Sequence, residues 1–158
     1  MATNTAPVPT LEESIEVAAT PAQVWALVTD LPRMASWSPQ VVRTKVKGGP
    51  VQLGTKASNL NRRGLLVWPT SSKVVRFEPH RDFAFRVKEN TTVWSFELQP
   101  LDDGARTRIV QRREAPDGIA PISIRLTKTL LGGVDAFTEE LRAGMRQTLQ
   151  RIKAELER

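Results

Sequence analysis

Two polar residues at the end of a predicted strand stand on the face that should point into the protein. Segment 106–114 alternates, and Gln111 and Arg113 follow Ile109 on the same face. Such an amide and guanidinium can orient the polar end of a bound molecule, since small-molecule sites have mostly apolar walls and a few placed polar groups. The alternatives are that Arg113 reaches water from the strand end and that Gln111 hydrogen-bonds a neighbouring strand or helix end.

A second polar pair lies earlier in the chain. Asn59 and Asn61 share a predicted inward face with Ala57, although asparagine is a poor strand residue. Two asparagines in one strand suggest a polar wall of the same binding site. The alternative is a turn, because the Asn-x-x-Gly of residues 61–64 is also ordinary loop chemistry.

Large apolar side chains could form the remaining walls. Core packing is the simpler role for any one aromatic residue, but a large aromatic side chain buries roughly 150–250 Å², so several would take a large share of a small core. Trp37 is expected to pack the short helices near the mouth of the site. The residues predicted to line it are Trp68, Phe85, Trp94 and Phe96 on strands, and Phe137, Leu141 and Met145 on the last helix.

Several kinds of chemistry are missing from this composition. There is no cysteine and a single histidine, which removes thiolate nucleophiles, thiolate metal sites and histidine clusters. His80 stands between Pro79 and Asp82, where a surface turn is expected, and acid–base catalysis would need it inside the site with a partner. We therefore predict neither a metal nor another cofactor.

The elements that must position these residues follow from local patterns. Thr20 and Pro21 are the N-cap and first residue of a predicted helix, and a second short helix is expected over 32–39. Apolar alternation and turn residues predict strands over 13–19, 41–47, 54–61, 65–78, 82–89 and both arms of a hairpin from 94 to 114.

The hairpin turn is placed at Asp102-Asp103-Gly104. Alternation and turn length then imply a register for the two arms. The implied cross-strand pairs are Leu98 with Thr107, Phe96 with Ile109, and Trp94 with Gln111.

The strongest periodic pattern lies at the end of the chain. Apolar residues recur at spacings of three and four, which predicts one amphipathic helix from near 133 to near 157. The fold class is therefore α+β: a curved antiparallel sheet of six to seven strands wrapped around a long C-terminal helix, with two short helices after the first strand. A single domain over 11–158 is expected after a disordered tail of residues 1–10.

Three segments resemble a known superfamily. They are "ATPAQVWALVTDLPRMASWSP", "NRRGLLVWPTSSKVVRFEPHRDFAFRV" and "MRQTLQRIKAELE". They are similar to the SRPBCC (START-like, helix-grip) superfamily, in its polyketide cyclase/dehydrase-like branch. The resemblance covers roughly residues 11–157 and implies a hydrophobic cavity between the sheet and the C-terminal helix, where members bind lipids, sterols, polyketides or other apolar molecules. It implies no catalytic residue, because no catalytic pattern of the family matches a position here.

Three functions are compatible with this reading. The first is binding of an apolar small molecule such as a lipid or polyketide. The second is a cyclase, aromatase or dehydratase that uses the same cavity, and the third is a regulatory or interaction protein with an incidental cavity. An enzyme needs titratable groups with shifted pKa values in its site, and this sequence offers few, which favours binding.

Net charge and apolar runs bear on partners and location. The net charge is +6, but the positive residues are dispersed, so a nucleic-acid partner is not expected. No run approaches the roughly 18–20 apolar residues of a membrane span and no secretory signal is recognisable, which predicts a cytoplasmic protein. Residues 119–133 are read as a lid, with membrane contact as the less favoured alternative.

Overall fold

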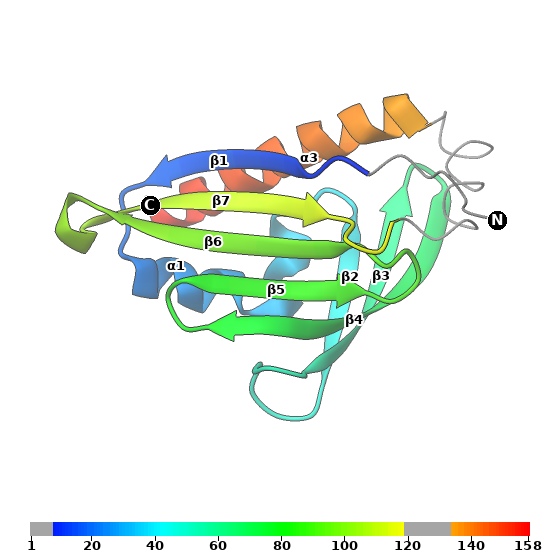
Figure 1. The fold of residues 1–158 in the computed structure, drawn as a ribbon, viewed down its shortest axis with the longest axis horizontal. Coiled ribbons are helices and arrows are strands. Elements are labelled where there is room, and N and C mark those ends of the chain that lie inside the picture. Colours follow the sequence, from blue (N-terminus) through cyan, green and yellow to red (C-terminus); the bar gives the residue numbers. More distant parts are fainter. Residues whose placement is uncertain (1–7, 119–133) are drawn as a thin grey trace.

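Seven strands form one antiparallel sheet in the order β1-β7-β6-β5-β4-β3-β2 (Figure 1). The computed structural model describes residues 8–118 and 134–158, so the predicted lid at 119–133 and most of the predicted tail lie outside the described residues. The elements are β1 (Leu11–Val17), α1 (Pro21–Val28), η1 (Leu31–Ser36), β2 (Val41–Lys47), β3 (Lys56–Arg63), β4 (Leu66–Glu78), β5 (Asp82–Val87), β6 (Val93–Leu101), η2 (Asp102–Gly104), β7 (Arg106–Glu114) and α3 (Val134–Leu156). The predicted α+β helix-grip architecture is confirmed.

Capping fixes the start of α1 as predicted. The Thr20 hydroxyl accepts a hydrogen bond from the Gln23 backbone N–H at 3.2 Å, and the Gln23 side chain accepts one from the Thr20 N–H at 2.9 Å. The second helix differs from the prediction, because it is a 3₁₀ helix that ends at Ser36. Pro39 follows closely, and the residue before a proline is disfavoured in the helical conformation, so the helix cannot extend to residue 39.

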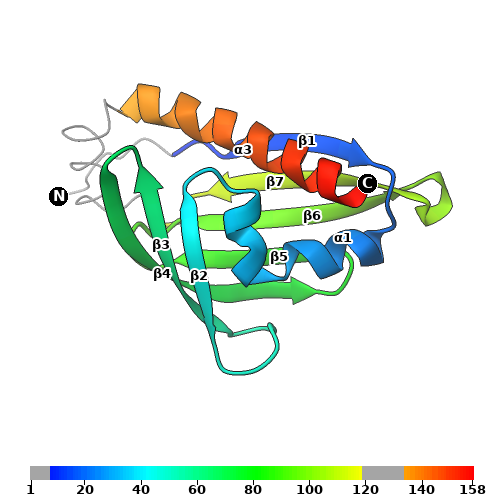
Figure 2. The same cartoon turned by 180° about the vertical axis from the view of Figure 1, so that it is seen from behind.

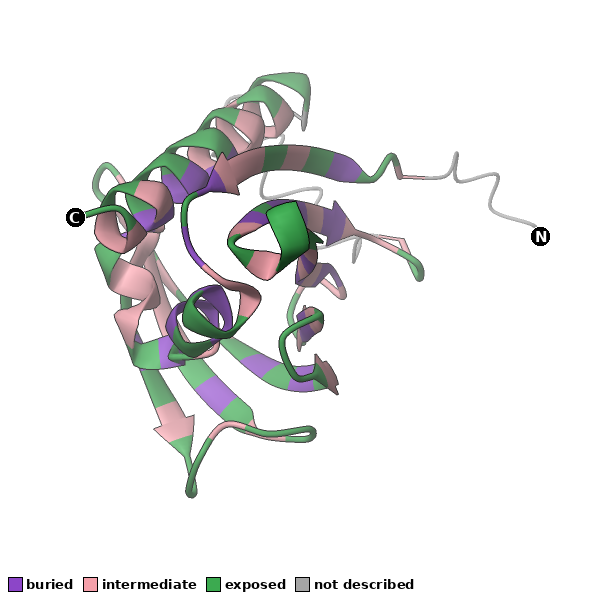
Figure 3. Ribbon diagram, turned by 90° about the vertical axis from the view of Figure 1, so that its left-hand side faces the viewer, coloured by how far each residue is buried: buried purple, intermediate pink, exposed green. Residues whose placement is uncertain are grey.

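Curvature of the sheet comes with irregular pairing. The register of β2 against β3 shifts between Val41 and Arg43, and that of β4 against β5 shifts between Val74 and Arg76. Such bulges bend and twist a strand, and here they lie in the half of the sheet formed by β2 to β4. Viewed from the side, the sheet curves with α1 and α3 on its concave face (Figure 3).

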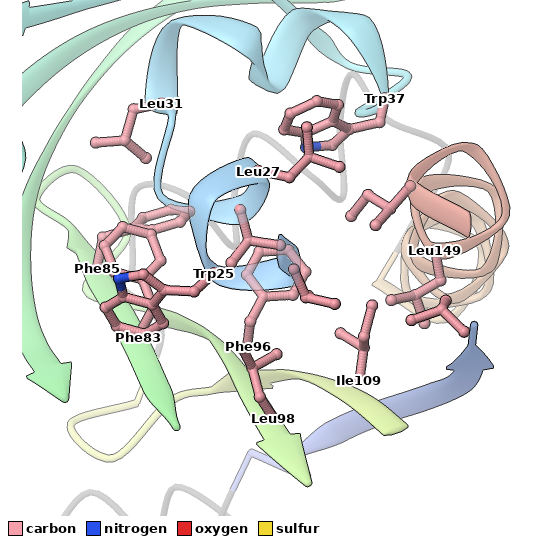
Figure 4. Close-up of a cluster of buried hydrophobic side chains, with 14 of the residues drawn as sticks. Trp25, Leu27, Leu31, Trp37, Phe83, Phe85, Phe96, Leu98, Ile109 and Leu149 are labelled. Carbon is pink, nitrogen blue, oxygen red and sulfur yellow. The ribbon is translucent and has the colours of Figure 1, made fainter. Parts of the chain in front are cut away.

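The hydrophobic core fills one part of that concave face. Side chains from α1, η1, β5, β6, β7 and α3 point toward one another in it (Figure 4). Trp25 packs edge-on against Phe83 and Phe77, with ring centroids 6.0 and 5.1 Å apart. Ile109 and Leu149 close the core between β7 and α3. Trp37 belongs to this core as well.

The register of the β6–β7 hairpin differs from the prediction by two residues. Leu101 pairs with Arg106, so four residues lie in the connection, where η2 is followed by Ala105. Asp102 and Asp103 both adopt positive φ there, which a pattern of apolar alternation does not reveal. The predicted pairs were therefore wrong: Trp94 is opposite Arg113, Phe96 opposite Gln111, and Leu98 opposite Ile109.

Helix α3 is tied to both sides of the curved sheet. On one side, Arg146 of α3 pairs with Glu13 of β1 at 2.8 Å. On the other, Glu140 of α3 pairs with Arg63 at the end of β3 at 2.6 Å. Figure 2 shows α3 running along β1 while the β3–β4 tip rises toward the start of the helix. The sheet thus holds the N-terminal half of α3 between its first and third strands.

Candidate functional site

Polar side chains line the concave face of β2, β3 and β4. Asn59 lies between Thr44 and Thr70 across the strands. Its Oδ1 accepts a hydrogen bond from the Thr44 hydroxyl at 3.0 Å, and its Nδ2 donates to Thr70 and Ser72, each at 3.4 Å. Asn61 Nδ2 donates to Thr70 Oγ1 at 2.9 Å. The two asparagines therefore belong to a hydrogen-bonded ladder on an inward face.

The alternative of a turn at Asn61 is wrong. Asn61 pairs with Trp68 inside the β3–β4 ladder, and β3 continues to Arg63. The turn itself consists of Gly64 and Leu65, where Gly64 has a φ of 59°, a conformation that glycine adopts at little cost.

Aromatic residues predicted for the site divide into two groups. Phe85 and Phe96 are buried within the hydrophobic core (Figure 4). Trp94 lies opposite Phe85 on the neighbouring strand and is only half-buried, packed against the edge of that core. Trp68 is also half-buried, on the concave side next to Asn61. The two tryptophans therefore continue the apolar surface beyond the closed core.

The end of β7 adds two buried polar side chains to the same face. Gln111 and Arg113 are 6% and 5% exposed. Among the described residues, neither Gln111 Oε1 nor Arg113 Nε has a hydrogen-bond partner. The guanidinium makes one long hydrogen bond within these ranges, 3.4 Å from Arg113 Nη2 to the Pro9 carbonyl. The expectation that Arg113 reaches water is not met, because its side chain is covered.

Burial changes the acid–base properties of this guanidinium. Desolvation lowers the pKa of Arg113 from its ordinary value, and the positive charge of Arg142 on α3 lowers it further. Arginine nevertheless remains protonated at neutral pH, so Arg113 is a buried cation beside a second cation.

The residues of α3 that were predicted to line the site become less buried toward the start of the helix. Met145 is 2% exposed, whereas Leu141 and Phe137, one and two turns nearer the start of the helix, are half-buried. Gly144 lies against the chain after η1, where an added Cβ would stand 3.3 Å from Pro39 Cγ. Close approach of the helix to that segment, and not to a strand, accounts for this glycine.

Other charged residues of the hairpin lie on the opposite face of the sheet. Arg112 pairs there with Glu12 at 2.6 Å and also with Glu97, and Arg108 pairs with Glu16 at 2.8 Å. A shallow open hollow lies over these strands, and a second lies over residues 47–56. Neither hollow lies between the sheet and α3, so an enclosed cavity there stays a prediction.

The remaining candidate groups are remote from this surface. His80 is exposed, in a turn with a φ of 66°, near the Trp25 ring. Among residues 8–118 and 134–158, no three His, Cys, Asp or Glu side chains gather as a metal site would need. In the same ranges, no helix is both long and apolar enough to cross a membrane.

Some residues of this surface were missed from sequence. Thr44 and Thr70 complete the asparagine ladder, and Arg142 brings a second positive charge to Arg113. Alternation along 65–78 could have identified Thr70, because it stands between Trp68 and Ser72 on one face. Nothing local indicates Arg142, since its proximity depends on how α3 crosses β7.

The whole described fold matches one protein family. Residues 8–157 match the family described as "Polyketide cyclase / dehydrase and lipid transport". The chain belongs to this family. This membership confirms the resemblance that the sequence segments indicated.

Solved structures extend the comparison. The polyketide cyclase-like protein Cgl2372 from Corynebacterium glutamicum is 30% identical to this family member, with 94% of this chain and 91% of that chain covered and a TM-score of 0.57. The Zhui aromatase/cyclase from Streptomyces sp. R1128 is 17% identical, with 95% and 94% covered and a TM-score of 0.71. The di-domain aromatase/cyclase StfQ of the steffimycin pathway is 16% identical with a TM-score of 0.73, and the match covers 94% of this chain and 50% of that one. The last two likenesses concern the fold alone. No curated protein sequence matches this chain.

Proposed function

We propose that this protein binds an apolar small molecule of the polyketide or lipid class between the concave face of its sheet and α3. Membership of a family described by polyketide cyclases, dehydrases and lipid transport supports this class of ligand. The proposed contact residues are those predicted from sequence, with Trp94, Trp68 and Leu141 as apolar walls and Asn61 and Gln111 as polar groups.

One observation carries the proposal: the concave face is closed at one end and incompletely covered at the other. Ile109 and Leu149 are fully buried in the core. Farther along the same face, Trp94 on the sheet and Leu141 on α3 are only half-buried. Apolar side chains on an inward face that remain partly exposed gain free energy when a further apolar molecule covers them.

The polar groups at this end fit the same role. Buried polar atoms in proteins are almost always hydrogen-bonded, yet Gln111 Oε1 lacks a partner among the described residues. A ligand that brings a hydroxyl or another hydrogen-bond donor to β7 would satisfy this acceptor. Apolar walls with a few convergent polar groups are the usual composition of a small-molecule site.

A fluorescence titration tests the proposal. The neutral probe N-phenyl-1-naphthylamine, which emits strongly in apolar surroundings, is titrated with wild-type protein and with Trp94→Ala. Loss of about 100 Å² of apolar contact, at roughly 25 cal/mol per Å², weakens binding about 10- to 100-fold. Leu53→Ala, an exposed residue between β2 and β3, is the control and should leave the affinity unchanged.

Two results would refute the proposal. One is a failure of the wild-type protein to bind the probe. The other is equal affinity of the wild-type protein and a folded Trp94→Ala variant, which would place the bound probe elsewhere. Native mass spectrometry of gently purified protein gives independent support if an apolar molecule co-purifies.

A further inference from the structure

Among the residues that the structure describes, no carboxylate pairs with the buried guanidinium of Arg113. Its side chain lies between Leu11 of β1 and Trp94 of β6, its neighbours across the sheet, and is 5% exposed. Within the described ranges it forms no ion pair, and its hydrogen bond is the 3.4 Å contact from Nη2 to the Pro9 carbonyl. Nε remains without a partner. A guanidinium has five N–H donors, and within the same ranges one of them is hydrogen-bonded.

Two carboxylates on elements around Arg113, those of Glu13 and Glu140, are engaged elsewhere. Glu13 shares the concave face with Arg113, but its carboxylate lies 2.8 Å from Arg146 and 3.9 Å from Arg142. Glu140 of α3 pairs with Arg63. Two arginines of α3, Arg142 and Arg146, thus surround the Glu13 carboxylate, which does not pair with Arg113.

The two segments outside the described ranges contain no acidic side chain. Residues 1–7 and 119–133, which lie outside the described ranges, contain neither aspartate nor glutamate. A side-chain carboxylate of this chain therefore does not neutralise Arg113. Buried charges are costly unless they are paired, so a cation in this position calls for an anion from outside the chain.

We propose that the ligand carries an anionic group, such as a carboxylate, at one end of its apolar body, and that Arg113 binds this group. The inference rests on the function proposed above and specifies its ligand class. A guanidinium matches a carboxylate in two parallel hydrogen bonds, and Arg142 adds positive potential from α3. Gln111, the preceding inward residue of β7, can donate a hydrogen bond from its Nε2 to the same group. Trp94, opposite Arg113, then contacts the apolar body where it joins the anionic end.

Competition between two matched ligands tests the inference. Decanoate and decan-1-ol have the same chain and differ in charge, and each displaces N-phenyl-1-naphthylamine from wild type, Arg113→Met, Arg113→Lys and Arg112→Met. Wild type should prefer decanoate, and Arg113→Met should lower that preference about 10- to 100-fold, the range expected for a charged hydrogen-bonded pair. Arg113→Lys keeps the charge without the planar fork and should retain part of the preference.

The neighbouring arginine is the matched control. Arg112→Met removes the same charge from the chain but from the opposite face, where Arg112 pairs with Glu12 and Glu97, so the preference should stay within about twofold of wild type. An equal loss in both methionine variants would assign the effect to net charge and overturn the inference.

The outcomes separate the two proposals. If the neutral probe does not bind wild type, the proposed function fails. If the probe binds and decanoate and decan-1-ol displace it equally well from wild type, the proposed function stands and the anionic ligand is refuted. If Arg113→Met does not fold, the test uses Arg113→Lys in its place. A folded Arg113→Lys variant that prefers decanoate as strongly as wild type does, with no dependence of that preference on salt concentration, would also refute the anionic ligand.

Discussion

Replacing Arg113 with methionine is expected to stabilise the ligand-free protein. Methionine keeps an unbranched stem that fills the same space, and it removes a buried cation that lacks a carboxylate partner. Loss of the 3.4 Å hydrogen bond to the Pro9 carbonyl opposes this, by about 0.5 kcal/mol, the low end for a hydrogen bond. Replacement of buried ion pairs by apolar residues of similar volume is often neutral or stabilising by about 1–4 kcal/mol, and a buried charge without a partner has less to lose, so a net gain of roughly 1–3 kcal/mol is expected for Arg113→Met.

Urea denaturation of delipidated protein measures the change. The midpoint should rise in Arg113→Met with the slope unchanged, which reports stability alone. Addition of decanoate should raise the midpoint of wild type and leave that of the variant nearly unchanged, because a ligand stabilises by binding the native state. The free protein would then carry a destabilising residue that its ligand compensates.

A clear result would refute this reasoning. If Arg113→Met loses more than about 1 kcal/mol with an unchanged slope, Arg113 is well paired in the free protein and its charge needs no external anion. Arg112→Met serves as the reference, and its exposed ion pairs should contribute only about 0–1 kcal/mol.

Two further predictions concern the scaffold. Thr20→Ala removes the N-cap of α1 and should lower the free energy of unfolding by about 1 kcal/mol in urea denaturation, whereas Thr20→Ser should retain most of it; equal losses would show that the hydroxyl does not act as the cap. A hydrogen bond from Arg112, and to a smaller extent one from Gln99, lowers the pKa of Glu97. The contribution of Glu97 to stability is therefore present above its unfolded pKa and is lost as the pH falls through its folded pKa. Glu97→Gln should therefore destabilise at pH 7 by less than about 1 kcal/mol and by less at acid pH, as urea midpoints at several pH values would show; a difference that grows on acidification contradicts the assignment.

The hairpin shows where local pattern stops being sufficient. Alternation correctly placed Gln111 and Arg113 on the inward face with Ile109, because the side-chain period of a strand is two. Pairing depends on the length of the connection, which local propensity leaves open. The connection contains four residues, of which two aspartates have positive φ. The register therefore differs from the predicted one by two residues. A shift by two residues preserves the face, so Gln111 and Arg113 were still predicted on the inward side of the sheet.

The asparagines illustrate a similar division. Their inward alternation with Ala57 was visible in the sequence, but the same letters also fit a turn. Pairing of β3 with β4 decided between the two readings, because Asn61 finds Trp68 and Thr70 across the ladder. The neighbouring strand of the hairpin supplied the partners that fixed Asn61 in the sheet.

The order of the elements, the cap of α1, the extent of the last helix and the inward faces of the strands could be predicted from the amino-acid sequence, because periodicity and capping are local properties. The burial of Arg113 without a carboxylate partner could not be predicted in this way. That fact depends on how α3 crosses the sheet, since the crossing turns Glu13 toward Arg146 and brings Arg142 close to Arg113. Charge pairing between distant segments is set by packing and does not follow from the spacing of residues along the chain.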